Sequence, residues 1–258
     1  MNRTFFTLVL ILTSAFALFA QGVRWEAQSA DKGETEKRTD HFFYMPRMMK
    51  MVEGDAGRFM ILRLDKELMI MGDPKEKNYY QLTFDEMEQM MKGVDAAMAE
   101  QMEAMKEQLA QLPEEQRKMA EEMMASRMRK EPKVDVTKTE ESSTISGYAC
   151  TKYVVKHDGQ HASTVWATRE ITGFDVMRSD MQEFARRMKA ITKNLGSKDP
   201  SGILEGVDGF PIQTETKDGW KTVVTKVDQS STPAAEFEVP AGYKKEDMPG
   251  MSDMPEGY

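Results

Sequence analysis

Methionine thioethers are the side chains of this sequence whose type and spacing could support ligand chemistry. The chain has 24 methionines in 258 residues. Two closely spaced groups fall outside any long helical pattern, namely Met45, Met48, Met49 and Met51, and then Met248, Met251 and Met254. Thioether sulfur is a soft ligand that selects Cu(I). One hypothesis is therefore a soft-metal (copper) binding protein whose ligands are these methionines.

The other methionines are arranged as an apolar stripe. From Met87 to Met128 they recur three and four residues apart, which is the spacing of one helix face. Thr83 and Glu86 form a capping-box pattern in front of the stripe. The sequence thus predicts a long helical insertion over residues 84–130. Because methionine is flexible and adaptable, this stripe suits a core or a surface that binds partner proteins.

Catalytic motifs are missing from the sequence. It contains no nucleophile elbow, no phosphate-binding glycine loop and no zinc-protease helix. Cys150 is the single cysteine, and we expect it to be buried on a strand. Acidic residues are spread evenly, so no carboxylate pair stands out for acid–base work. We therefore expect a protein that is not an enzyme and that needs no cofactor.

The first twenty residues have the character of a signal peptide. Arg3 gives a short basic start, and an apolar run from Phe5 to Phe19 follows, too short for a spanning helix. No cysteine follows the expected cleavage site, so no lipid anchor is predicted, and no later segment is apolar enough to span a bilayer. We expect a periplasmic or secreted protein. Its net charge of −8 argues against nucleic acid as a partner.

The elements that must position these side chains follow from periodicity. Residues 23–83 predict an antiparallel meander of short strands, and strands return after Pro132. A second capping box at Ser179–Gln182 predicts an amphipathic helix that begins there. Two further strands with a Lys217–Gly219 turn follow, and the tail from Lys244 is expected to be disordered. We predict one α+β domain over residues 21–243, followed by a tail over residues 244–258.

Several short motifs occur in an order that resembles a known family. They are Asn78-Tyr79-Tyr80, Leu112-Pro113-Glu114-Glu115, Gly147-Tyr148-Ala149-Cys150, Val165-Trp166-Ala167-Thr168, Gly209-Phe210-Pro211 and Val239-Pro240-Ala241-Gly242-Tyr243. The chain resembles the bacterial domain-of-unknown-function family 4412. The resemblance implies a LolA-like fold, which is a curved antiparallel sheet (an incomplete barrel) covered by helices. Carriers of that fold bind acyl chains, whereas the family itself has no established activity.

Three hypotheses remain open. In the first, the chain is a periplasmic binding module for an apolar ligand such as a lipid or acyl chain. The candidate cavity residues are Tyr153, Trp166, Phe210, Met98 and Met105. In the second, it is a structural or interaction protein that binds a periplasmic protein partner and no small ligand. The third is the soft-metal hypothesis above.

Overall fold

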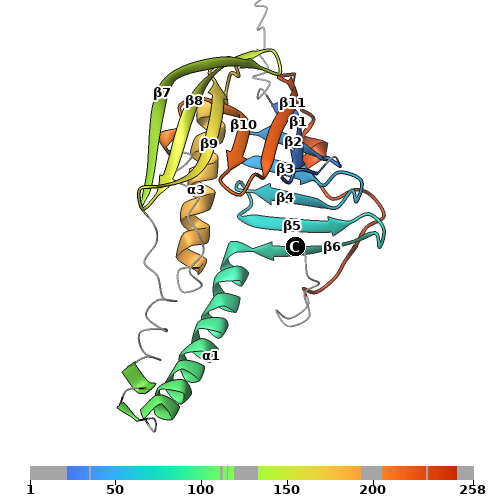
Figure 1. Ribbon diagram of the computed structural model, residues 1–258. Helices are drawn as coiled ribbons and strands as arrows, with labels where there is room; N and C mark the ends of the chain where they lie inside the picture. The colour runs from blue at the N-terminus through green and yellow to red at the C-terminus, as the bar shows by residue number, and fades with distance from the viewer. Residues whose placement is uncertain are drawn as a thin grey trace, which may run out of the picture.

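A computed structural model describes residues 22–34, 36–110, 113–114, 116–118, 133–192, 205–230 and 232–248. The described strands form a single sheet of 12 strands in the order β12-β6-β5-β4-β3-β2-β1-β11-β10-β9-β8-β7. Its pairings are antiparallel except for that of β12 with β6. The sheet is curved and open, with β12 and β7 as its two edges (Figure 1). The predicted class, a curved, incompletely closed antiparallel sheet with helices, is confirmed.

The first half of the sheet is the predicted meander. Each strand pairs with the next, because short polar turns join them. The strands are β1 (Val23–Ala30), β2 (Arg38–Met45), β3 (Met48–Val52), β4 (Phe59–Arg63), β5 (Leu68–Asp73) and β6 (Asn78–Thr83). In the second half, β1 pairs with β11 near the end of the chain. The strands there are β7 (Val134–Ile145), β8 (Tyr148–His157), β9 (Gln160–Thr168), β10 (Phe210–Thr216) and β11 (Lys221–Asp228).

One face of the sheet, here called the inner face, carries helix α3 (Phe174–Thr192), and Figure 1 shows the sheet curving around it. Side chains that lie directly opposite each other on neighbouring strands form a row across β1–β6. This covered row consists of Val23, Tyr44, Met49, Leu62, Met69 and Leu82. Met181, Phe184, Met188 and Ile191 of α3 pack against its central part, around Leu62. The apolar stripe of α3 is thus buried on the inner face.

Helix α3 begins earlier than the sequence predicts. The second capping box was expected to start it at Ser179, whereas it starts at Phe174. Phe174 and Met177 are both buried, so the apolar stripe continues toward the N-terminus. The capping-box prediction at Ser179 was therefore wrong, because Ser179 lies inside the helix, five residues after its start. Next to it, the Asp180 carboxylate accepts hydrogen bonds from the sheet.

The opposite, outer face is covered by the C-terminal segment. A short 3-10 helix, η1 (Ala234–Phe237), inserts the fully buried Phe237 against Phe59, Ile61 and Ile70. Arg63, which is also buried, donates hydrogen bonds to the Phe237 carbonyl (3.2 Å) and to Glu238 (2.6 Å). Its guanidinium also forms a two-point ion pair with Asp65 at 2.8 and 2.7 Å. The C-terminal segment is therefore held by apolar burial and by one buried cation.

The expected disordered tail begins with ordered residues. Lys244–Lys245 forms β12, a parallel edge strand beside β6, and the Glu246 amide donates to the Tyr79 carbonyl at 2.9 Å. Tyr243 packs near Phe59, with ring centroids 5.6 Å apart, and so places this segment against the sheet edge. The prediction of disorder from Lys244 was wrong for residues 244–248. The remainder of the tail and the predicted signal peptide lie outside the described residues.

Helix α1 (Phe84–Ala110) starts at the predicted capping box. The Thr83 amide donates to Glu86 at 2.7 Å, and the Glu86 amide donates to the Thr83 hydroxyl at 3.2 Å. Phe84, Met87 and Met91 are buried, while later turns extend away from the sheet (Figure 1). The insertion was predicted to continue to residue 130. Most of residues 111–130 lie outside the described part of the chain, so that extension stays a prediction.

We expect the two ends of α1 to differ in their contribution to stability. Met87 is 7% exposed and Met105 is 43% exposed. Replacing Met87 by Ala removes a packed side chain and should lower the unfolding free energy by about 2–3 kcal/mol. The matched change Met105→Ala, on the same helix, should stay within about 0.5 kcal/mol of the wild type. Urea unfolding measures both, and equal losses would contradict the described packing of α1.

Candidate functional site

An apolar pocket of about 230 Å³ lies on the inner face under the first half of α3. Strands β1, β2, β10 and β11 form its floor, and α3 forms its wall. The lining side chains are mainly apolar, including Trp25, Ala27, Phe42, Phe174, Met177, Met181, Phe210, Ile212 and Val224. Arg178, Thr214 and Thr222 supply the polar groups among the lining residues. This composition suits an apolar ligand that has a small polar group.

Aromatic rings give the pocket its shape. Trp25 and Phe42 stack with their ring centroids 4.9 Å apart and an interplanar angle of 3°. Phe210 meets Trp25 edge-on at 5.5 Å and Phe174 edge-on at 5.7 Å. Aromatic pairs in these geometries are favourable beyond the area they bury. The four rings come from β1, β2, β10 and α3, so the pocket is made by the tertiary structure.

A buried polar contact fixes α3 above this floor. The Tyr44 hydroxyl donates to the Asp180 carboxylate at 2.7 Å, and the Arg47 amide donates to the same oxygen at 2.6 Å. Burial raises the pKa of the Tyr44 phenol, and the hydrogen bond to Asp180 and its negative charge raise it further. Tyr44 therefore stays a neutral donor. Arg47 also forms a two-point ion pair with Glu183, one turn further along α3.

Of the four predicted cavity residues whose side chains the structure describes, Phe210 lines this pocket, and Tyr153, Trp166 and Met105 do not. Tyr153 is buried in a separate cluster with Val155, Val165 and Val207, and its hydroxyl donates to the Asp208 carbonyl at 3.0 Å. Trp166 does not line the pocket, although it packs against the cluster that includes Phe210 and Phe174. The Lys152 ammonium lies 5.9 Å from the centre of its ring.

Of the two predicted methionines on the insertion, Met105 lies away from the pocket. Met105 is exposed on the part of α1 that extends from the sheet. Met98 belongs to the same helix, but its side chain is outside the described structure. The two were predicted as lining residues because helical spacing alone places them on the apolar stripe. Among the described side chains of α1, Phe84 and Met87 in its first turn pack with α3 and the sheet.

The predicted metal ligands of the first group are divided between two faces. Met45 and Met48 pack with the outer-face cluster around Phe59 and Phe237. Met49 and Met51 alternate with Met48 along β3 and so lie on the inner face. The pleat therefore places Met45 and Met48 on one face and Met49 and Met51 on the other. Of the second group, Met248 is half-buried, and Met251 and Met254 lie outside the described residues.

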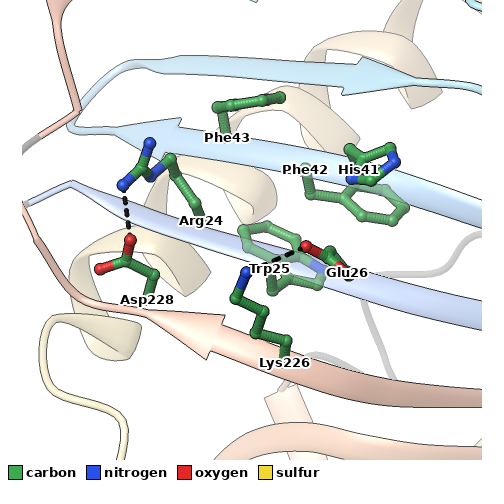
Figure 2. A pocket seen from close by; sticks show the side chains of 8 residues that line it. All are labelled: Arg24, Trp25, Glu26, His41, Phe42, Phe43, Lys226 and Asp228. Carbon is green, nitrogen blue, oxygen red and sulfur yellow. Dashed lines mark hydrogen bonds and ion pairs between the residues drawn. The ribbon is translucent and has the colours of Figure 1, made fainter.

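A second pocket, of about 220 Å³, is lined by residues of β1, β2 and β11, which also form part of the floor of the first pocket. Figure 2 shows Arg24 beside Asp228 and Lys226 beside Glu26, and the corresponding ion-pair distances are 2.5 and 3.4 Å. Arg24 and Glu26 alternate with Trp25 along β1 and lie on the face away from it. Within each pair the positive and the negative charge cancel, so these four side chains give the pocket no net charge.

Comparison with known proteins decides the family. The profile of DUF4412, a domain of unknown function, matches residues 69–243. The chain belongs to the DUF4412 family. The predicted resemblance is thereby confirmed. No curated protein sequence matches this DUF4412 chain.

Solved structures similar to this DUF4412 protein have little sequence in common with it. An uncharacterized conserved protein from Thermus thermophilus has a TM-score of 0.45 and 8% identity, with 89% of this chain and 91% of that chain covered. PNGF-II has a TM-score of 0.40 and 10% identity, with 90% and 32% covered. MucB has a TM-score of 0.39 and 8% identity, with 88% and 60% covered. The chain thus spans about a third of PNGF-II and three fifths of MucB.

The residues that form the pocket were missed by sequence reasoning, apart from Phe210. Trp25, Phe42 and Phe174 stand far from Phe210 in the sequence, and none belongs to a motif. The available signal was alternation, which places Trp25 with Val23 and Ala27 on one face of β1.

Among the described residues, no helix is long and apolar enough to cross a membrane. Likewise, no cluster of three or more His, Cys, Asp or Glu in the described part could hold a metal.

Proposed function

We propose that this protein is an exported binding module, not an enzyme, and that it holds an apolar ligand in the pocket under α3. The observation that supports the proposal is the apolar pocket itself, which four aromatic rings and aliphatic side chains line on the inner face. Its volume of about 230 Å³ is below the range of sites for drug-sized ligands, about 300–1,000 Å³. A single aliphatic chain, entering by its end, fits such a pocket.

Arg178 at the pocket suits a ligand with an acidic end. Its guanidinium pairs with Asp175, donates to the Val207 carbonyl at 3.2 Å and lies 5.6 Å from the centre of the Phe174 ring. These contacts hold the cation at the pocket wall, while its side chain is still 24% exposed. Since a guanidinium binds carboxylates well, we take a fatty acid as the ligand class. An apolar pocket with a cation at its wall agrees with a carrier or sensor of such chains.

The experiment is a binding titration with a fluorescent long-chain fatty acid. Thr214 lines the pocket from β10 and is half-buried. In Thr214→Phe, the ring should fill space that two to four methylene groups of the ligand occupy. At about 0.8 kcal/mol for each buried methylene, the dissociation constant should rise roughly 15- to 200-fold. Native mass spectrometry of protein purified from the periplasm should show a co-purifying lipid.

The matched control is Gln213→Phe. Gln213 is the preceding residue of β10, lies directly opposite Trp166 on β9 and does not line the pocket, so the same ring is introduced next to the pocket residues but outside the pocket. The Gln213→Phe variant should bind the fluorescent fatty acid as the wild type does. Absence of saturable binding in the wild type, or equal affinity in Thr214→Phe and the wild type, would refute the proposal.

A further inference from the structure

Three methionines lie side by side on the inner face, next to the covered row. Met51 of β3 is directly opposite Met60 of β4, and Met60 is directly opposite Met71 of β5. Directly opposite side chains of antiparallel strands have Cβ atoms about 4.5–5.5 Å apart. We call Met51, Met60 and Met71 the methionine row. Phe42 lies beyond Met51 and Tyr80 beyond Met71, so aromatic residues bound the row at both ends.

Packing under α3 does not account for the methionine row. The adjacent covered row contributes Met49, Leu62 and Met69 to the cluster that α3 closes. Of the apolar clusters formed by the described side chains, none includes Met51, Met60 or Met71. All three are half-buried. The sheet therefore presents three thioethers together at a partly accessible position.

The chemistry of this set is narrow. Thioether sulfur is a neutral, soft ligand that suits Cu(I), whereas Mg²⁺ and Ca²⁺ need oxygen ligands and Zn²⁺ prefers thiolate and imidazole. Each methionine has three rotatable bonds beyond Cα, so sulfurs on neighbouring strands can turn toward one point. The three ligands come from the adjacent strands β3, β4 and β5, and Met60 lies on the middle one. The register of the sheet thus supplies a ligand set that the linear sequence does not display.

We propose that Met51, Met60 and Met71 bind one Cu(I) ion through their three sulfurs. The site is separate from the pocket under α3, since none of the three methionines lines that pocket. Binding needs no change in the backbone, because the strand pairings already place the three ligands opposite one another. Sequence spacing suggested the group Met45, Met48, Met49 and Met51. The proposed site shares only Met51 with that group.

The test is an anaerobic titration of the full-length mature protein with Cu(I) in competition with a chromogenic Cu(I) chelator. We expect one Cu(I) per chain and, by X-ray absorption, a first shell of sulfur only. Met60→Leu removes the central ligand while conserving volume, so folding should be retained. Its affinity for Cu(I) should fall at least tenfold, and circular dichroism should match the wild type.

Two controls separate this site from other methionines. Met48→Leu changes a thioether on the outer face of β3, and Met248→Leu combined with Met251→Leu and Met254→Leu changes the tail. Both variants should bind Cu(I) as the wild type does, and so should the pocket variant Thr214→Phe. The proposal is overturned if the wild type takes no Cu(I) from the chelator or if Met60→Leu binds equally well. Loss of binding in either control variant would also overturn it.

Discussion

Replacing Asp180 by Ala should lower the unfolding free energy by about 3–5 kcal/mol, since a buried charged acceptor with two hydrogen bonds is removed. Asp180 is only 6% exposed. Without it, the buried Tyr44 hydroxyl loses its acceptor at 2.7 Å, and the partly buried Arg47 amide loses its acceptor at 2.6 Å. Urea unfolding followed by circular dichroism measures the change. We also expect weaker fatty-acid binding, because this contact holds α3 over the pocket.

A control for Asp180 lies one turn along the same helix. Glu183 pairs with Arg47, but the two side chains are 32% and 44% exposed. Glu183→Ala should therefore cost no more than about 1 kcal/mol. Tyr44→Phe should cost about 1–2 kcal/mol, and a double-mutant cycle of Tyr44→Phe with Asp180→Ala should show strong coupling. If Asp180→Ala unfolds like Glu183→Ala, the contact does not anchor α3.

Replacing Arg63 by Met should lower the unfolding free energy at pH 7 by about 2–3 kcal/mol, because the buried guanidinium and its four hydrogen bonds are removed, two of them to the outer-face segment and two to Asp65. We expect no larger loss of stability, because the partner carboxylates of Asp65 and Glu238 are 35% and 55% exposed and can be hydrated in the variant. The C-terminal segment should loosen first. Amide hydrogen exchange should rise in residues 234–246, a segment that includes η1 and β12.

The contribution of Arg63 should depend on pH in a defined direction. Its hydrogen bonds hold the pKa values of Asp65 and Glu238 below their ordinary range. Folding therefore favours the deprotonated carboxylates, and the stability they add is complete above their unfolded pKa values of about 4. It is lost as the pH falls through the lower folded values. The stability difference between wild type and Arg63→Met should shrink from pH 7 to pH 2, and a constant difference would contradict this linkage.

Local patterns predicted much of the fold. The meander of residues 23–83, the capping box at Thr83 and the burial of Cys150 all depend on neighbouring residues, and each is confirmed. The turn at Asp158–Gly159 is also local. Its two residues have φ angles of 49° and 79°, as a two-residue hairpin turn requires. Family membership followed from short motifs in a fixed order.

The site was decided by contacts between distant parts of the chain. A period of two shows that Met48 and Met49 point to opposite faces, but it does not say which face α3 covers and which face η1 covers. The pairing of β1 with β11 brings Trp25 and Phe42 to Phe210, and α3 adds Phe174. Likewise, Met51, Met60 and Met71 become neighbours only through the register of β3, β4 and β5.

The sequence by itself determined the elements, the family and the wealth of thioethers, because these depend on local spacing and composition. The tertiary structure alone decided which thioethers lie together, which aromatic rings form a pocket and where α3 is anchored. The physical reason is that strand register and face coverage are set by long-range pairing and burial. Asp180 illustrates the difference, since its local pattern places it only on a helix, whereas its buried hydrogen bonds to the sheet make it an anchor.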